Sequence, residues 1–189
     1  YPKRPDLLRR ANRLIAEHYG ETLGAGADAA GAKRYHYAKP HHHEVEDFYA
    51  TSPALAEEVV AVADLKPGME VLEPSAGDGA IVAAILAAGI TPDCVENDPN
   101  RVETLRDMLP PGCVTQMDFL AMRPEPEFDR VLMNPPWGRH ADVQHVFHAL
   151  RFLKPGGRLV AIMSPNLPHR NDGPTMELRG LINAWGGWV

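Results

Sequence analysis

The chain has 189 residues, of which 44% are hydrophobic and 23% charged, a composition typical of one globular domain with a substantial core. Its net charge of −6 excludes an overall basic signature for nucleic-acid binding. No apolar run approaches the length of a transmembrane helix and no signal peptide is visible. We therefore expect a soluble cytoplasmic protein without membrane contact.

The charge is distributed unevenly along the chain. Residues 1–44 contain eight Lys/Arg and five Asp/Glu, a net charge of +3, whereas the remainder carries −9. A contact with a polyanion would therefore come from a local patch, a partner or a segment outside this chain. Because the chain begins at Tyr1 and stops at Val189, we expect it to be trimmed.

Residues 1–44 are predicted to form a lead to the main domain. A helix is expected over residues 5–19, followed by a Gly/Ala-rich linker over residues 24–31. The helix either docks on the domain through its apolar stripe or touches nucleic acid. Residues 35–43 are basic and rich in histidine, but they lack the spaced ligands of a metal site. They predict an exposed loop, and we expect no metal.

Residues 45–189 alternate between strand and helix patterns. The expected strands cover residues 69–73, 93–96, 114–117, 131–133 and 159–163, and the expected helices begin near residues 53, 80, 98, 143 and 178. Ser52 and Pro53 suit the cap and the first position of the first of these helices. Such alternation predicts an α/β fold with a doubly wound, mostly parallel sheet.

A glycine loop, residues 74–79, joins the first strand to the next helix. Its glycines let backbone N–H groups approach a ligand at the positive end of a helix, which is typical of nucleotide binding. Glu96 ends the second strand, seventeen positions beyond Gly79. An acidic residue at that place binds a ribose diol in such folds, so the spacing strengthens the interpretation.

A rigid polar loop, Asn134-Pro135-Pro136-Trp137, follows the apolar run 131–133. The prolines restrict the backbone, so the Asn134 carboxamide and the neighbouring carbonyls are held beside an indole ring. Two acceptors and a π face suit a planar amino group. The alternative is a Pro-Pro turn followed by a core tryptophan.

Asp118 and Phe119 follow the third strand. The carboxylate can accept a hydrogen bond from an exocyclic amine, and the phenyl ring can pack on a purine. The alternative, an aspartate in a turn followed by a core phenylalanine, explains the same two residues.

Together these segments resemble the class I S-adenosylmethionine-dependent methyltransferases, especially adenine-N6 DNA methyltransferases with the gamma order of motifs. The resemblance implies a Rossmann-like fold and S-adenosyl-L-methionine as cofactor. It assigns cofactor binding to Phe48, Tyr49, Thr51, Pro53, Glu73, Pro74, Ser75, Ala76, Gly77, Gly79, Glu96, Asn97, Asp118, Phe119 and Asn134.

The chain departs from that family in two respects. The sheet of these enzymes ends in an antiparallel hairpin, and this chain stops before one. They also carry a target-recognition region, and no segment here is long enough for it. The resemblance therefore implies a separate specificity region or subunit.

The expected reaction is methyl transfer to an exocyclic amino nitrogen, with adenine N6 in DNA as the first candidate. The catalytic residues would be Asn134, Pro135, Pro136 and Trp137, and phosphate contacts are expected from Arg139, His140, His169 and Arg170. The alternatives are another planar amino group, in an RNA base, cytosine N4 or protein glutamine, and a non-catalytic methyltransferase-fold binding subunit.

Overall fold

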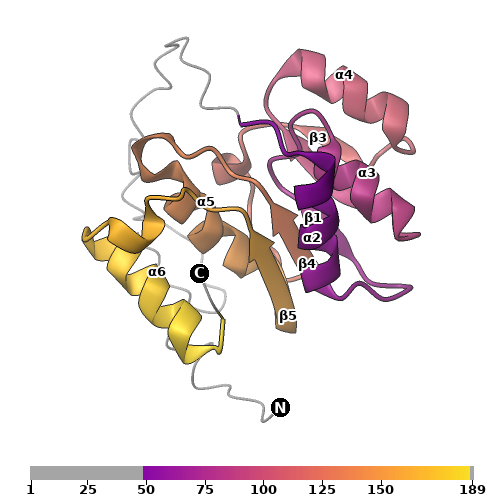
Figure 1. Cartoon of the computed structure of the whole chain (residues 1–189). Coiled ribbons are helices and arrows are strands. Elements are labelled where there is room, and N and C mark those ends of the chain that lie inside the picture. Colours follow the sequence, from indigo (N-terminus) through magenta and orange to yellow (C-terminus); the bar gives the residue numbers. More distant parts are fainter. Residues whose placement is uncertain (1–48, 188–189) are drawn as a thin grey trace, which may run out of the picture. The chain divides into compact units, whose positions relative to one another are not determined.

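The computed structural model describes residues 49–187 (Figure 1). Five strands, β1 (Val71–Glu73), β2 (Asp93–Glu96), β3 (Val114–Gln116), β4 (Phe128–Met133) and β5 (Leu153–Ala161), form one sheet in the order β3-β2-β1-β4-β5. Every pair of neighbouring strands is parallel. The predicted α/β fold with a doubly wound parallel sheet is therefore confirmed. The helix expected over residues 5–19, the histidine-rich stretch and Phe48 lie outside the described residues.

Within the described part of the chain, five α-helices alternate with the strands: α2 (Pro53–Ala63), α3 (Ala80–Ala87), α4 (Pro99–Met108), α5 (Ala141–Ala149) and α6 (Gly173–Ala184). Short 3₁₀ turns lie at η1 (Phe119–Ala121), η2 (Gly138–His140), η3 (Leu150–Phe152) and η4 (Leu167–His169). Ser52 caps α2 by accepting the Leu55 N–H at 3.3 Å, with Pro53 in the first turn. Both residues were predicted for these positions.

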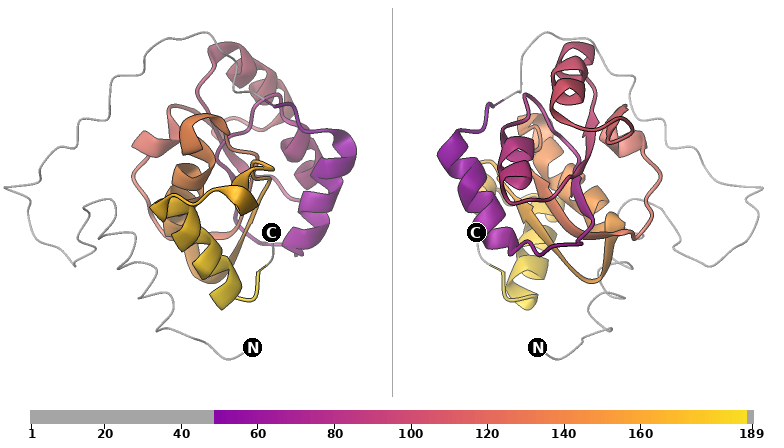
Figure 2. Two further views of the ribbon diagram at one scale, coloured as in Figure 1. Left: turned by 60° about the vertical axis from the view of Figure 1, so that its left-hand side comes forward. Right: turned by 90° about the vertical axis from the view of Figure 1, so that its right-hand side faces the viewer.

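The helices cover both faces of the sheet (Figures 1 and 2). Helices α2 and α3 pack with β1 and β4 in one apolar cluster, whose buried members are Ala56, Val59, Ala63, Val71, Ile81, Ile85, Ile90 and Leu132. A second cluster joins α3 and α4 to β2. Helices α5 and α6 lie on the opposite face of the sheet. Within residues 49–187, no helix has the length and apolar character needed to cross a bilayer.

The buried face of α2 differs from the one expected. The pattern predicts Leu55, Val59, Val62 and Ala63 in the core. Val59 and Ala63 are buried as predicted, but Leu55 is 36% exposed and Val62 44% exposed, and Ala56 is buried in their place. Because α2 is apolar at most of its positions, its periodicity fits more than one face. The small side chains allow α2 to lie close to its neighbours, which selects the alanine face.

The start of β5 also differs from the prediction. The expected strand begins at residue 159, whereas β5 begins at Leu153 and contains residues 154–157 as an irregularity. Phe128 pairs with Leu153, but Arg130 pairs with Arg158, so the register shifts across the Pro-Gly-Gly segment. A proline and two glycines interrupt a ladder without ending it, since the surplus residues bulge from the strand.

The strand order places the topological switch point between β1 and β4. The chain leaves β1 towards α3 and leaves β4 towards α5, which cover opposite faces. Ligands of such sheets bind at the carboxyl ends of the strands beside this point. Residues 74–79 and 134–137 both emerge there, because they follow directly after β1 and β4.

Gly79 provides a test of the packing beneath the glycine loop. It has a φ of +86°, and a Cβ on it would lie 2.8 Å from Met108 Sδ. Gly89 has a similar φ of +80° but nothing within 4 Å of that position. We expect Gly79→Ala to lower the free energy of unfolding by about 2–3 kcal/mol and Gly89→Ala by about 1 kcal/mol. Urea unfolding measures both, and equal losses would contradict the clash with Met108.

Candidate functional site

The glycine loop is fastened to the end of β2 by hydrogen bonds. The Ala76 N–H donates to the Val95 carbonyl at 3.1 Å, and the Gly77 N–H donates to Glu96 Oε2 at 2.7 Å. Gly77 and Gly79 have φ values of +55° and +86°, in the left-handed region that favours glycine. The loop therefore needs these glycines for its path, and Glu96 holds its shape.

Glu96 is the centre of a small network of backbone donors. Its Oε1 accepts the N–H groups of Asn97 and Asp98, each at 2.8 Å, in addition to the Gly77 bond on Oε2. A carboxylate has about four acceptor sites, so these three bonds leave capacity for a further donor. Glu96 can thus shape the loop and still accept a hydroxyl from a ligand.

Glu73, at the end of β1, is fully buried with 0% exposure. Its Oε1 accepts the Ser75 N–H at 3.1 Å, whereas Oε2 has no hydrogen-bond partner among residues 49–187. Burial raises the pKa of Glu73 to about 8, against the Ser75 bond that lowers it, and the charge of Glu96 raises it further. The carboxyl group is therefore largely protonated at neutral pH.

Asn134 is held by the segment that precedes α2. Its Nδ2 donates to the Tyr49 carbonyl and to Thr51 Oγ1, both at 3.0 Å. Its Oδ1 is buried and has no hydrogen-bond partner within the described residues. The carboxamide thus presents an unpaired acceptor at the end of β4, and Glu73 Oε2 is likewise unpaired at the end of the neighbouring strand β1.

Trp137 lies against the same segment. Its ring stacks on the Tyr49 ring with centroids 4.3 Å apart and planes 21° from parallel, and its Nε1–H donates to the Ile162 carbonyl at 3.4 Å. Sequence reasoning placed Tyr49 and Thr51 in a cofactor motif and did not foresee these contacts. No local pattern reveals them, since more than eighty residues separate the partners.

Asp118 and Phe119 make contacts that match the turn-and-core alternative. Asp118 is exposed and caps η1, and Phe119 is buried with 3% exposure. The Phe119 ring packs against His145, His148 and Phe152. Burial lowers the pKa of His148 to about 4, so this histidine is neutral at pH 7. The role of Asp118 and Phe119 towards a purine stays a prediction.

The first turn of α5 and the loop that follows β5 are joined by a buried ion pair that the sequence did not predict. Asp142 is completely buried and accepts from Nη1 and Nη2 of Arg170. His140 Nδ1 also lies 3.3 Å from Asp172 Oδ2. Arg170 was expected to contact phosphate, but its guanidinium is bound to Asp142 instead. Arg139 and His169 are exposed in the loops after β4 and β5.

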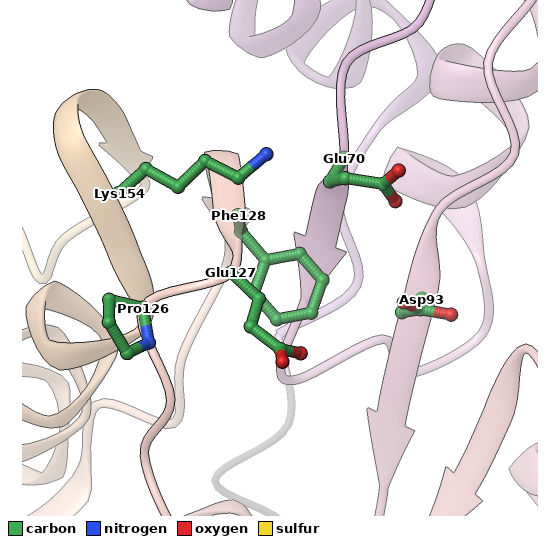
Figure 3. Close-up of a pocket in the computed structure, with 6 residues that line it drawn as sticks. All are labelled: Glu70, Asp93, Pro126, Glu127, Phe128 and Lys154. Atoms are coloured by element: carbon green, nitrogen blue, oxygen red, sulfur yellow. The ribbon is translucent and has the colours of Figure 1, made fainter.

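A cavity of about 410 Å³ lies at the amino ends of the strands, at the end of the sheet opposite the glycine loop (Figure 3). It is lined by Glu70, Asp93, Pro126, Glu127, Phe128 and Lys154, which lie at or before the amino ends of the strands. The ammonium group of Lys154 is bound to Asp129 at 2.8 Å. The remaining charges are carboxylates, which disfavours an anionic ligand. No group of three or more His, Cys, Asp or Glu suited to a metal ion occurs within residues 49–187.

Comparison with solved structures identifies the fold. An RNA methyltransferase from Salinibacter ruber in complex with S-adenosyl-L-homocysteine has a TM-score of 0.52 at 18% identity, over 61% of this chain and 79% of that one. The glycopeptide N-methyltransferase MtfA complexed with sinefungin has a TM-score of 0.51 at 20% identity, over 65% of this chain and 59% of that one. The chain has the class I methyltransferase fold.

Two curated relatives from Thermus thermophilus are similar in sequence to this methyltransferase-fold chain. A tRNA (guanine(6)-N2)-methyltransferase is 32% identical over 147 residues, which are 68% of this chain and 44% of the relative. The type II methyltransferase M.TthHB8I is 35% identical over 111 residues, 55% of this chain and 24% of the relative. The chain thus spans less than half the length of either relative. No protein-family model matches the chain.

The raised pKa of Glu73 predicts that the stability of the folded protein depends on pH. Because its folded pKa of about 8 exceeds its ordinary value of 4.5, the folded state binds more protons between these values, and stability falls as pH rises through that window. Gln cannot ionise, so we expect Glu73→Gln to gain stability over wild type, on the order of 3 kcal/mol, between pH 5 and pH 8. Urea unfolding across this range measures the gain. The exposed Glu57→Gln is the control, and a Glu73→Gln profile parallel to wild type would reject the assignment.

Proposed function

We propose that this domain is an S-adenosyl-L-methionine-dependent N-methyltransferase that acts on an exocyclic amino group of a nucleic acid. Our first candidate for the substrate is adenine N6 in DNA, on the order and identity of the sequence motifs. The name of the 32%-identical relative, a tRNA (guanine(6)-N2)-methyltransferase, favours an amino group of an RNA guanine as the second candidate.

The observation that carries the proposal is the unpaired Oδ1 of Asn134. Leaving a buried acceptor without a partner costs about 1–3 kcal/mol, a cost that a substrate N–H donor would remove. The Pro135 carbonyl, one residue further on, offers the second acceptor that a planar amino group needs. Trp137 follows in the same loop, and its stack on Tyr49 supports a role as the aromatic surface for this group.

The residues around the glycine loop suit the proposed cofactor. S-adenosyl-L-methionine carries an ammonium group and two ribose hydroxyls, all of which donate hydrogen bonds. Glu73 Oε2 is buried without a partner, and loss of the Glu73 proton would leave a carboxylate that suits the ammonium group. Glu96 retains acceptor capacity beside its backbone bonds. When bound, the cofactor supplies an electrophilic methyl group on a sulfonium. The carboxylate of Asp118 is the proposed acceptor for the adenine amino group.

In the proposed mechanism, the chain positions the acceptor nitrogen and needs no strong base. An exocyclic amino nitrogen is a poor nucleophile, because its lone pair is delocalised into the ring. Acceptance of its two N–H bonds by Asn134 Oδ1 and the Pro135 carbonyl favours a pyramidal nitrogen with its lone pair free for transfer. The product proton is acidic and leaves to water. The fixed Asn134 carboxamide supplies this positioning of the nitrogen.

Trp137 is the proposed stacking surface for a base that has left the duplex. Flipping costs a few kcal/mol, which stacking on an aromatic side chain of about 1–3 kcal/mol offsets. The Tyr49 ring already covers part of the indole, so the base contact falls to the remaining Trp137 surface. The exposed Arg139 and His169 are the proposed phosphate contacts in the adjacent loops.

Replacing Asn134 separates transfer from cofactor binding. We expect Asn134→Ala to lower the rate of methyl transfer by at least about 100-fold, because a preorganised acceptor at the reacting nitrogen is lost. The affinity for S-adenosyl-L-methionine, measured by calorimetry, should stay nearly unchanged. Asn100→Ala, on the exposed side of α4, should retain full activity. Weakened cofactor binding with retained turnover would reject the assignment of Asn134.

A labelled-methyl assay with the full-length protein decides the substrate class. Duplex DNA, single-stranded DNA, tRNA and protein are offered in parallel, and the modified nucleoside or amino acid is identified by mass spectrometry. We expect N6-methyladenine from DNA. N2-methylguanine from tRNA would establish the second candidate instead. Absence of both transfer and cofactor binding would contradict the enzymatic proposal and support a binding subunit.

A further inference from the structure

We propose that Tyr49 and Thr51 are positioning residues that orient the Asn134 carboxamide, so that its oxygen and not its nitrogen faces the acceptor. The inference rests on the proposed N-methyltransferase function and deepens it. It assigns to the segment before α2 a role in choosing the chemical class of the acceptor.

The two partners of Asn134 Nδ2 distinguish the two ends of the carboxamide. The oxygen and nitrogen ends have nearly the same shape, so packing alone does not choose between them. The Tyr49 carbonyl, 3.0 Å from Nδ2, can only accept. A flipped amide would place Oδ1 against this carbonyl, which brings two acceptors together. It would also lose the Thr51 bond unless the hydroxyl rotated to donate.

The orientation decides which groups the site can receive. With Oδ1 unpaired, the site accepts hydrogen bonds and suits an amino group that has two N–H donors. With Nδ2 in its place, an amino group would meet a donor, and a ring nitrogen or carbonyl would be preferred instead. The contacts with Tyr49 and Thr51 therefore select an amino nitrogen over the acceptor atoms that border it on a base.

The segment is rigid enough to act as a template. Ser52 caps α2, and the Ser52 carbonyl accepts the Ala56 N–H at 3.0 Å. Ala56 and Val59 then anchor the helix in the core with 1% and 5% exposure. Thr51 stands one residue before the cap, so its backbone is anchored to a helix that packs on the strand carrying Asn134.

The segment before α2 also contacts Trp137, at the far end of the loop 134–137. The Tyr49 ring lies on Trp137, whose Nε1–H is bound to the Ile162 carbonyl. Tyr49 thus contacts Asn134 through its carbonyl and Trp137 through its ring. Loss of the ring would leave the carbonyl in place, so the two contributions can be separated by substitution.

Thr51→Val tests the hydroxyl because it keeps the side-chain shape, Thr51→Ser restores the hydroxyl, and Thr104→Val on the exposed side of α4 is the matched control. We expect Thr51→Val to lower kcat by about tenfold, the factor that corresponds to loss of one hydrogen bond of about 1.4 kcal/mol. The dissociation constant of S-adenosyl-L-methionine should change less than about twofold, since one bond to Asn134 is lost and no bond to the cofactor. Thr51→Ser should return kcat to within about threefold of wild type.

Tyr49→Ala gives an independent result if Thr51→Val does not fold. We expect a higher KM for the base-containing substrate with a smaller change in kcat, because the indole loses its stacked neighbour while the backbone carbonyl at position 49 still holds Asn134. A cofactor affinity that falls while kcat holds, in either variant, would make these residues cofactor contacts and overturn the proposal.

Nuclear magnetic resonance of the Asn134 side-chain amide separates this inference from the proposed function. We expect its two N–H resonances, assigned by comparison with Asn134→Ala, to shift and to exchange faster in Thr51→Val but not in Thr51→Ser. Unchanged resonances in Thr51→Val would overturn the positioning role. If the wild-type protein transfers no methyl group to any acceptor, the proposed function fails, and the resonances still decide whether Thr51 orients Asn134.

Discussion

Two hydrogen bonds from Asn134 Nδ2, to the Tyr49 carbonyl and to Thr51 Oγ1, are the contacts on which the candidate site depends. They join the loop after β4 to the segment before α2, and they determine which atom of the carboxamide remains unpaired. The stack of Tyr49 on Trp137 reinforces the same junction. The polar group that could act on a substrate is therefore positioned by tertiary contacts, although it stands on a rigid Pro-Pro loop.

The fold retains two destabilising features at the carboxyl ends of β1 and β4. Glu73 Oε2 and Asn134 Oδ1 are both buried oxygens without partners inside residues 49–187. Glu73 ends β1, and Asn134 follows the neighbouring strand β4. Burial of Glu73 also raises its pKa to about 8. Unpaired buried groups are costly in a folded protein, so their concentration at the switch point is the physical argument for ligand binding there. The acidic cavity at the amino ends of the strands has charged groups that are exposed to solvent or already paired.

Polar contacts hold the segments around the site on both sides of the switch point. Glu96 holds the glycine loop to β2 through the Gly77 N–H, and the buried Asp142–Arg170 pair joins the first turn of α5 to the loop after β5. Breaking a buried ion pair is strongly destabilising, because one charge is left without a partner. Arg170 accordingly contributes to the shape of the site, while Arg139 and His169 remain exposed in the loops after β4 and β5.

Local patterns in the sequence determined the alternation of strands and helices, the parallel sheet, the Ser52-Pro53 helix start and the two loops at the switch point. These features follow from periodicity, caps, glycine and proline, which act over a few residues. Tertiary structure alone decided the buried face of α2, the role of Arg170, the packing of Phe119 among histidines and the partners of Asn134. Those outcomes depend on which side chains meet across more than twenty residues of chain, and no short-range pattern encodes that choice.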